Sequence, residues 1–263
     1  MVILTKLINS LLRSIEGLIP AKNRLPLRCA YLRLTGNLDP ELLLMKKLGQ
    51  SSGCFLDVGA NIGVYSYSLL DQFSHVHLFE PLSEITFLAR ELLNDKISIR
   101  NVALSNTEGD LDFFIPILEG KLKYTRASLE PPSHQYLIRR VPVRTIDSFE
   151  FENVEVIKID VEGHELQVLK GAEVTLQSSR PILICEIEQR HSPVDISKTF
   201  DFLASQNYLG YFLGDENLVD VSEFTPARHQ ILDSEQRHKG RYINNFIFLP
   251  SEKAQKLRNL LKN

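Results

Sequence analysis

The sequence predicts an α/β fold built on a mostly parallel sheet with helices on both faces. Short apolar runs that fit buried strands alternate with segments of helical period, a glycine turn follows the first run, and acids recur where the runs end. Alternation of this kind is typical of parallel sheets, because consecutive parallel strands are joined by crossover helices. The predicted strands are residues 54–58, 75–79, 97–101, 154–160 and 182–187, and the helices between them are residues 62–72, 82–94 and 165–177.

Length and composition are those of an ordinary globular protein. The chain has 263 residues, of which 43% are hydrophobic and 24% charged, enough for one large α/β domain or two small ones. The formal net charge of −3 argues against a nucleic-acid partner held mainly by phosphate contacts, which favour a basic surface. Cys29, Cys54 and Cys185 are widely spaced, so we expect buried thiols in a reducing, cytoplasmic compartment and no zinc site.

Residues 1–48 are predicted to form a helical extension. Residues 1–19 carry apolar side chains in a helical stripe, but four charged or polar residues interrupt it, so it is too polar to span a bilayer. It also lacks the features of a signal peptide. We expect a helix that packs on the domain or on a partner chain, with peripheral contact to a membrane surface as the alternative.

The link to the main domain is predicted from prolines. Pro20 and Pro26 are expected to bracket a linker, and Asp39 followed by Pro40 signals the start of a helix over residues 40–48. The main domain is assigned to residues 49–263.

An irregular part interrupts the strand and helix alternation of this domain. Residues 111–115 and 138–143 are predicted as two extra strands, joined by the long segment 116–137. Loops of this length in a compact domain tend to be functional, so we expect a lid or a wall of the substrate site. Beyond it the sequence predicts a helix over residues 195–206, strands over 208–213 and 245–249, and a closing helix over 251–261.

The glycine turn is predicted to hold a small ligand. It reads Asp57-Val58-Gly59-Ala60-Asn61-Ile62-Gly63 and leads from a buried strand into a helix. Glycine allows a sharp bend and close approach of the backbone to a ligand. Asn61 is expected to cap the helix, whose first amides and dipole suit an electron-rich group.

A second acid suggests that the ligand contains a nucleoside. Glu80 ends the next predicted strand about 20 residues beyond the glycine turn, where an acid can accept hydrogen bonds from a ribose diol. The middle glycine of a dinucleotide fingerprint is missing, and Asp57 would repel a pyrophosphate but could pair with the ammonium or sulfonium of S-adenosylmethionine. The sequence therefore favours S-adenosylmethionine, with a nicotinamide-dependent oxidoreductase as the alternative.

Reactive side chains gather after the fourth predicted strand. Asp160, Glu162 and His164 come from one loop, and Glu186 ends the neighbouring strand. Carboxylate and imidazole groups are the usual proton acceptors for a hydroxyl nucleophile. Alternatively, Asp160 and Glu162 cap the following helix, and Glu165 is expected to be structural. A divalent metal held by Asp160, Glu162 and Glu186 is possible but not predicted.

Five motifs together resemble the FkbM-type methyltransferase family. They are D-V-G-A-N-I-G, F-E-P, N-V-A-L-S-N-T-E-G, R-T-I-D-S and K-I-D-V-E-G-H-E-L-Q-V-L-K-G-A, in this order over about residues 50–190. The resemblance implies a Rossmann-like class I methyltransferase fold and S-adenosylmethionine-dependent methyl transfer to a hydroxyl. It places the acceptor among glycans, glycolipids and polyketides, and a non-catalytic adaptor with the same fold is the remaining alternative.

The resemblance also assigns residues by position. It implies that the glycine turn lines the methionine side of the cofactor, that Glu80 holds the ribose, and that the end of the third strand lies against the adenine. The implied cofactor residues are Asp57, Gly59, Asn61, Gly63, Glu80, Asn101 and Ala103, and Arg144, Thr145 and Asp147 are expected to be scaffold. The family block makes Asp160, Glu162 and His164 the active-site candidates, and the position of Glu186 at a strand end adds it as a fourth catalytic candidate. The N-terminal helix and residues 116–137 are expected to set substrate choice.

Overall fold

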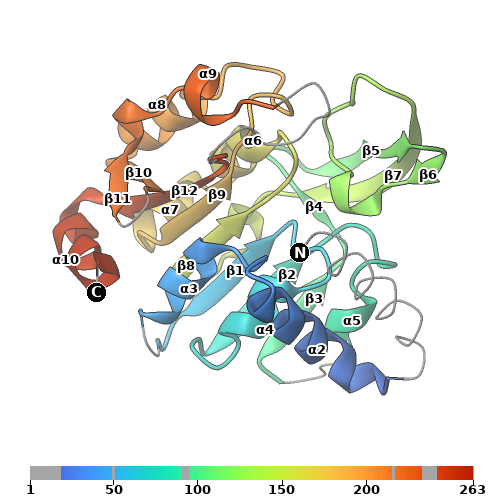
Figure 1. Cartoon of the computed structure of the whole chain (residues 1–263), viewed down its shortest axis with the longest axis horizontal. Helices are drawn as coiled ribbons and strands as arrows, with labels where there is room; N and C mark the ends of the chain where they lie inside the picture. Colours follow the sequence, from blue (N-terminus) through green and yellow to red (C-terminus); the bar gives the residue numbers. More distant parts are fainter. Residues whose placement is uncertain (1–18, 49–50, 91–94, 215–216, 233–241, 263) are drawn as a thin grey trace.

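The computed structural model describes residues 19–48, 51–90, 95–214, 217–232 and 242–262 (Figure 1). The helical stripe predicted for residues 1–18 lies outside the described residues. Of the helices that are described, none combines the length and the apolar character that a bilayer crossing requires.

The predicted parallel sheet is confirmed, and it forms the centre of the molecule. In the described part of the chain it has eight strands in the order β11-β10-β12-β9-β8-β1-β2-β3. The five strands from β9 to β3 are parallel, whereas β12 runs antiparallel to both of its neighbours. The bounds are β1 Cys54–Val58, β2 His75–Phe79, β3 Ile97–Arg100, β8 Val154–Ile159, β9 Ile182–Glu186, β10 Tyr208–Leu213, β11 Leu218–Asp220 and β12 Asn245–Pro250.

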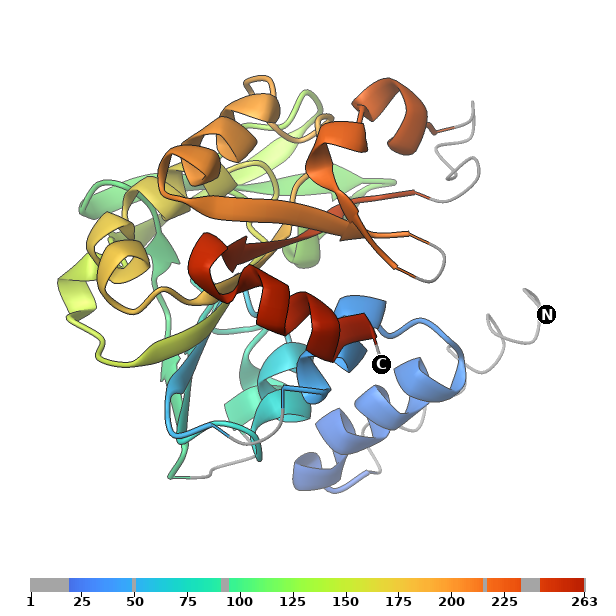
Figure 2. The same cartoon turned by 90° about the vertical axis from the view of Figure 1, so that its left-hand side faces the viewer.

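Helices cover both faces of this sheet, as the sequence predicts (Figure 2). Successive strand residues point to opposite faces, so Leu56 and Val58 pack with Val168, Leu169 and Leu203 on the face of α6, α7 and α8. Phe55 packs on the opposite face against α3, α4 and α10. The helix bounds are α2 Ala21–Leu34, α3 Pro40–Lys46, α4 Val64–Leu69, α5 Phe87–Arg90, α6 Glu165–Lys170, α7 Glu173–Ser178, α8 Ser197–Ser205, α9 Pro226–His229 and α10 Ser251–Lys262.

A second, smaller sheet stands beyond the end of the main one (Figure 1). It has the order β4-β7-β5-β6 and contains both extra strands, which are longer than predicted. The segment between them is folded back on β5, since Phe114 and Ser128 exchange two backbone hydrogen bonds of 2.8 and 3.1 Å. The elements are β4 Ala103–Leu104, β5 Gly109–Leu118, β6 Lys121–Leu122, the 3-10 helix η2 Tyr124–Arg126 and β7 Tyr136–Arg144.

The linker predicted between Pro20 and Pro26 is wrong, because helix α2 occupies this part of the chain. Pro20 is the N-cap of α2 and Pro26 lies inside it. Proline disfavours a helix interior by about 3 kcal/mol, but Leu25 and Cys29 are buried against α4 and offset this. Tertiary packing thus overrides the local signal on which the prediction was based.

The single helix predicted over residues 165–177 is also wrong, because the structure divides it into α6 and α7. Gly171 is the C-cap of α6, and Ala172 is the N-cap of α7. A Cβ atom on Gly171 would lie 2.0 Å from the carbonyl oxygen of Ser105. Glycine is therefore required where the helical chain breaks against the loop after β4.

Asp147 caps α7 from the neighbouring 3-10 helix η3, Asp147–Phe149. Its carboxylate accepts hydrogen bonds from the amides of Val174 and Thr175, both at 2.9 Å, and from the Thr175 hydroxyl at 2.7 Å. This contact supports the scaffold role expected for the R-T-I-D-S motif.

We predict that Asp147→Ala lowers the free energy of unfolding by about 1 kcal/mol, because it removes the cap of α7. Urea unfolding followed by circular dichroism measures this change. Asp201→Ala is the matched control, since Asp201 is exposed on α8. Equal loss of stability in the two variants would refute the capping role.

Candidate active site

Strand geometry brings four charged residues to the same face of the sheet. Asp57 and Lys158 are direct partners in the pairing of β1 with β8. Asp160 follows Lys158 by two residues, so it points the same way. Glu186 ends β9, the next strand, on the face occupied by Ile182 and Ile184. The predicted convergence of acids at the carboxyl ends of the strands is therefore confirmed for Asp57, Asp160 and Glu186.

Lys158 is the buried cation of this group. Its side chain is 3% exposed, and Nζ lies 3.9 Å from both Asp160 Oδ2 and Glu186 Oε2. The ammonium group also lies 5.3 Å from the centre of the Tyr65 ring. Burial alone would lower the pKa of Lys158, but Asp160 and Glu186 outweigh this effect and raise it to about 12. Lys158 is thus charged throughout the neutral range.

Asp160 and Glu186 form a carboxyl pair around this ammonium group. Burial, and then repulsion from Asp160, raises the pKa of Glu186 to about 9, so its carboxyl group is protonated at neutral pH. The two side chains are hydrogen-bonded to each other. Burial raises the pKa of Asp160 as well, but Lys158 acts in the opposite direction. Asn244 Nδ2 donates to Glu186 Oε1 at 2.7 Å and fixes the outer end of the pair.

The glycine turn passes directly beneath the Asp160 loop. Gly59 has a φ of +71°, and a Cβ atom on it would lie 1.8 Å from the carbonyl oxygen of Asp160. The amides of Gly59 and Ala60 both donate to the Phe79 carbonyl, at 3.0 and 3.1 Å. Only glycine fits this approach, which sets the spacing between the turn and the acids.

The expected capping role of Asn61 is wrong. Helix α4 begins at Val64 with Gly63 as its N-cap, and Asn61 has a φ of +52° within the turn. Asp57 performs this function from β1: its Oδ2 accepts from the Ser66 amide at 2.9 Å and from the Ser66 hydroxyl at 2.6 Å. Burial raises the pKa of Asp57 to about 6, although the Ser66 hydrogen bonds oppose this shift.

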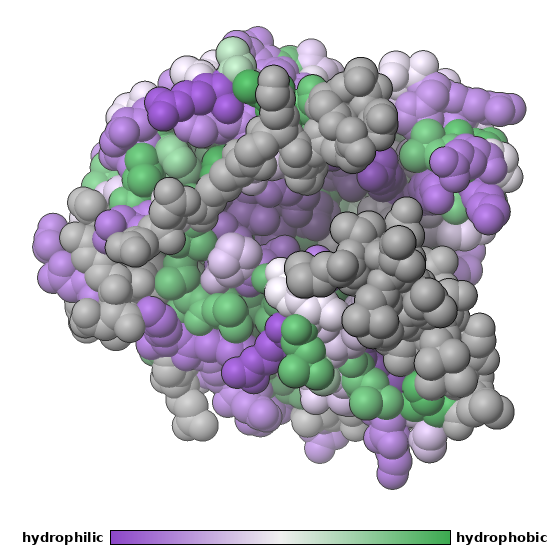
Figure 3. Space-filling view, in the orientation of Figure 1, coloured by the Kyte–Doolittle hydropathy of each residue, from purple (hydrophilic) through white to green (hydrophobic). Residues whose placement is uncertain are grey.

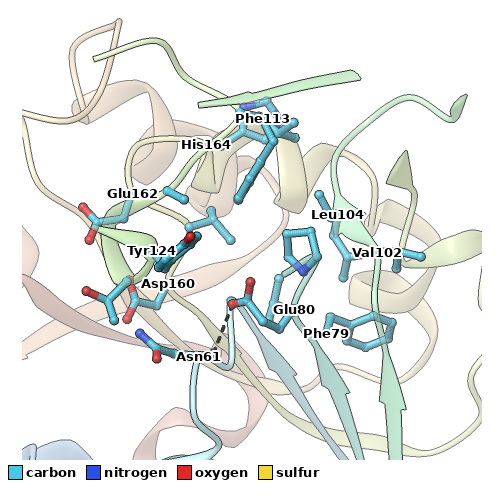
Figure 4. Close-up of a pocket in the computed structure, with 18 residues that line it drawn as sticks. Asn61, Phe79, Glu80, Val102, Leu104, Phe113, Tyr124, Asp160, Glu162 and His164 are labelled. Atoms are coloured by element: carbon cyan, nitrogen blue, oxygen red, sulfur yellow. Dashed lines mark hydrogen bonds between the residues drawn. The ribbon is translucent and has the colours of Figure 1, made fainter. Parts of the chain in front are cut away.

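Glu80 faces the turn from the end of β2 (Figure 4). Its Oε2 accepts from the Asn61 amide at 3.2 Å, and its Oε1 accepts from the Leu82 amide at 3.0 Å. Burial raises the pKa of Glu80 to about 7, against the effect of these two hydrogen bonds. The carboxyl group is therefore fixed in place and titrates near neutrality.

A hollow opens in front of this carboxyl group, and we call it the Glu80 hollow. Its empty space, including the part open to solvent, is about 560 Å³. Figure 4 shows Glu80, Asn61 and Asp160 at its polar side and Val102, Leu104 and Phe113 at its apolar side. Its other lining residues are Val58, Gly59, Phe79, Pro81, Ala103, Tyr124, Thr125, Ala127, Leu129, Val161, Glu162 and His164.

Two of these observations differ from the sequence assignment at the third strand. Asn101 does not line the hollow; its Nδ2 donates to the Glu80 carbonyl at 2.9 Å, so it braces the acid from behind. The apolar wall is instead formed by Val102, Ala103 and Leu104, of which only Ala103 was expected. Val102 and Leu104 flank Ala103 in the same N-V-A-L motif, and this position could have identified them from the sequence.

A second hollow, the α2 hollow, adjoins the first. Its empty space, including the part open to solvent, is about 910 Å³, and it shares Gly59, Asn61, Thr125 and Asp160 with the Glu80 hollow. Helix α2 and the loop after it form the far wall. Figure 3 shows that this face of the molecule is hollowed near its centre, with hydrophilic residues inside the depression. Its remaining lining residues are Arg28, Leu32, Asn37, Leu38, Asp39, Asp57, Ala60, Ile62, Val64, Tyr65 and Lys158.

The other two loop candidates, Glu162 and His164, each contact polar side chains from other segments of the chain. Glu162 Oε2 lies 2.5 Å from His191 Nδ1. His164 lies between the Ser105 hydroxyl, 2.8 Å from Nε2, and Glu130 Oε1, 2.7 Å from Nδ1.

The segment 116–137 is fastened to the same loop. The Ser128 hydroxyl donates to the Val161 carbonyl at 2.9 Å, and Glu130 bonds to His164. Glu165, expected to be structural, accepts from the Gly163 amide at 2.9 Å and is buried. The loop is therefore braced by its own first helical turn on one side and by residues 116–137 on the other.

The sequence match to known proteins fits this geometry. Residues 57–211 match the methyltransferase FkbM domain, which is more than half of the chain. This chain belongs to the FkbM methyltransferase family. It is also 29% identical, over 169 residues, to the hexuronic acid methyltransferase AglP of Haloferax volcanii; the match covers 63% of this chain and 68% of that protein.

Solved methyltransferases resemble it more distantly. Methyltransferase FkbM from Methylobacillus flagellatus aligns with a TM-score of 0.49 and 18% identity over 75% of this chain, which spans only 43% of that protein. TrmK of M. capricolum, in complex with S-adenosylhomocysteine, aligns with a TM-score of 0.42 and 11% identity over 81% of this chain and 69% of that protein.

Family membership identifies the chain as an S-adenosylmethionine-dependent methyltransferase and sets aside the oxidoreductase and adaptor alternatives. The residues present fit that cofactor. The Glu80 hollow offers an apolar wall and a carboxyl group that suit an adenosine. The α2 hollow is lined by the acids Asp39, Asp57 and Asp160 and by the cations Arg28 and Lys158, so groups of both signs face a ligand that carries an ammonium, a sulfonium and a carboxylate.

The metal alternative is not supported by the described part of the chain. No group of three or more histidine, cysteine, aspartate or glutamate side chains is arranged there to hold a metal ion. Glu162 pairs with His191, whereas Asp160 and Glu186 surround Lys158. A cation already occupies the position between two of the three proposed ligands.

We predict that Glu80→Ala weakens S-adenosylhomocysteine binding by about tenfold or more, because hydrogen bonds to a charged acceptor contribute about 1.5–3 kcal/mol. With a pKa of about 7, Glu80 gains its charge as the pH rises, so wild-type affinity should increase between pH 6 and 8. Isothermal titration calorimetry measures both effects.

Glu84→Ala is the matched control, since Glu84 is an exposed acid four residues further on that pairs with Arg139. Unchanged affinity in the Glu80 variant would discard the ribose assignment.

Proposed function

We propose that this chain transfers the methyl group of S-adenosylmethionine to a hydroxyl group of a glycan or glycolipid. The proposal rests on the position of Asp160, whose carboxylate lines both the Glu80 hollow and the α2 hollow. A side chain in that position can reach an acceptor hydroxyl that meets the cofactor where the two hollows join. When bound, S-adenosylmethionine supplies an electrophilic methyl group.

Asp160 is the proposed general base. A hydroxyl is a poor nucleophile until a positioned group accepts its proton, and such a group typically contributes 10²- to 10⁴-fold to the rate. The side chain of Asp160 is 38% exposed and lines both hollows. Its carboxylate would take the acceptor proton as the hydroxyl oxygen bonds to the methyl group and the methyl–sulfur bond breaks.

Lys158 and Glu186 set the charge and orientation of that carboxylate. The Lys158 ammonium group opposes the effect of burial on the pKa of Asp160 and so favours the carboxylate form. Glu186 is protonated near neutral pH and is hydrogen-bonded to Asp160. We propose that it orients Asp160 and does not itself accept the proton.

Glu162 and His164 are proposed as positioning residues. Glu162 is paired with His191, and both nitrogens of His164 have partners, so neither side chain is free to accept a proton from an acceptor. Together they hold the Asp160 loop between residues 116–137 and the segment after β9. This placement supports the proposal that residues 116–137 form a wall of the acceptor site.

A third hollow supports a polar acceptor. It lies next to Glu162, and its empty space, including the part open to solvent, is about 920 Å³. Hydroxyl, imidazole and guanidinium groups line it, together with prolines and the carboxylates of Glu130 and Glu162. Side chains that can donate many hydrogen bonds suit the hydroxyl and carboxylate groups of a sugar. The related AglP protein is described as a hexuronic acid methyltransferase, which also favours a carbohydrate. The lining includes Arg126, Ser128, Ser133, His134, Arg190, His191 and Ser192.

The test is transfer of label from radioactive S-adenosylmethionine into fractionated cell extract, with and without a chelator. We expect label in polysaccharide or glycolipid. Label found only in protein would overturn the carbohydrate assignment. Loss of transfer on chelation would show that a metal takes part.

We predict that Asp160→Asn lowers this transfer by about 100-fold or more, because it removes the proton acceptor. The affinity for S-adenosylhomocysteine should stay nearly the same, and calorimetry checks it. Asp195→Asn is the control, since Asp195 is exposed at the start of α8. Full transfer by the Asp160 variant would exclude Asp160 as the base.

A further inference from the structure

The α2 hollow contains a buried polar atom without a hydrogen-bond partner. Arg28 Nε is buried and makes no hydrogen bond with a described residue. The Arg28 side chain lines the hollow. A buried donor without an acceptor destabilises a fold by about 1–3 kcal/mol, so such groups call for an explanation.

Arg28 is placed there by the packing of α2. Leu25, one turn earlier, is fully buried, and its Cδ2 lies 3.6 Å from where a Cβ atom on Gly63 would stand. Residues three apart lie on the same side of a helix, so Arg28 follows Leu25 onto the side that faces the glycine turn. Cys29, also buried, fixes the same turn of α2.

The charges around Arg28 indicate an anionic partner. The hollow has two cationic lining residues among those described, Arg28 and Lys158. Lys158 is engaged by Asp160 and Glu186, and Asp57 is engaged by Ser66. Arg28 has no carboxylate partner within the described part of the chain, so its guanidinium group is the one lining cation there that is available to a ligand.

We infer that Arg28 binds the carboxylate at the methionine end of S-adenosylmethionine, so that α2 forms part of the cofactor site. The inference rests on the cofactor placement proposed above. A guanidinium group matches a carboxylate in a bidentate geometry. The same hollow offers Asp39, Asp57 and Asp160 to the ammonium and sulfonium groups, so both signs of the ligand meet their complement.

This assignment gives the N-terminal extension a role in cofactor binding. The sequence assigns substrate choice to the N-terminal helix over residues 1–19 and predicts no site residue between that helix and the main domain. Arg28 and Leu32 of α2, with Asn37 and Asp39 after it, line the hollow that adjoins the glycine turn.

The test compares two ligands that differ only at the methionine end. S-adenosylhomocysteine carries the amino-acid group, and 5′-methylthioadenosine lacks it. We expect Arg28→Gln to weaken S-adenosylhomocysteine binding by about tenfold or more and to leave 5′-methylthioadenosine binding within about twofold of wild type. Calorimetric titration of the full chain measures both.

Arg33→Gln is the matched control, because Arg33 is exposed on the last turn of α2 and does not line the hollow. It should leave both affinities unchanged. Unaltered S-adenosylhomocysteine binding in Arg28→Gln would overturn the inference, as would an equal loss for both ligands, which would show that Arg28 only supports the fold. If wild-type protein bound neither ligand, the proposed function itself would fail.

Discussion

The site depends on one buried charge, the ammonium group of Lys158. An isolated ammonium group in a protein interior is strongly unfavourable, so it needs compensating charge. Asp160 provides negative charge at 3.9 Å, the protonated Glu186 places a carboxyl oxygen at the same distance, and Asp57 stands opposite Lys158 in the neighbouring strand. Without the cation, three carboxyl groups would crowd one sheet edge and repel one another. With it, Asp160 can remain ionised in a partly desolvated position.

Backbone geometry fixes where this charge acts. Gly59 lets the turn after β1 pass beneath the Asp160 carbonyl, and its amide joins the turn to β2 through Phe79. The acid of β2, Glu80, is held by the turn amide of Asn61. The base candidate and the ribose-binding candidate therefore belong to one rigid unit, in which the distance between them is set by strand spacing and not by flexible side chains.

Much of the fold could be predicted from the sequence because local signals agreed with the tertiary structure. Strands β1, β2 and β10 have the predicted bounds, since each is a short apolar run ended by a turn residue or an acid. Helix α2 was missed because Pro26 contradicts a helix locally, and only the burial of Leu25 reverses that signal. Contacts between distant segments decide such cases, and a single sequence does not show them.

The site residues that lie at the carboxyl ends of strands could be predicted from the sequence. Asp160 and Glu186 could be placed by that rule, but Lys158 could not be recognised until its register opposite Asp57 was known. The sequence assigns the capping of α4 to Asn61, but Asp57 of β1 caps this helix. The partners of Glu162 and His164 come from His191, Ser105 and Glu130, which are remote in the chain.

The most direct test of this account is the pKa of Asp160, measured by carbon-13 NMR titration of labelled aspartate in wild type and in Lys158→Met. Removing the positive charge should raise the pKa of Asp160, and Lys158→Arg should restore it towards the wild-type value while preserving the fold. An Asp160 pKa that is the same in all three proteins would contradict the claim that Lys158 keeps this carboxylate ionised.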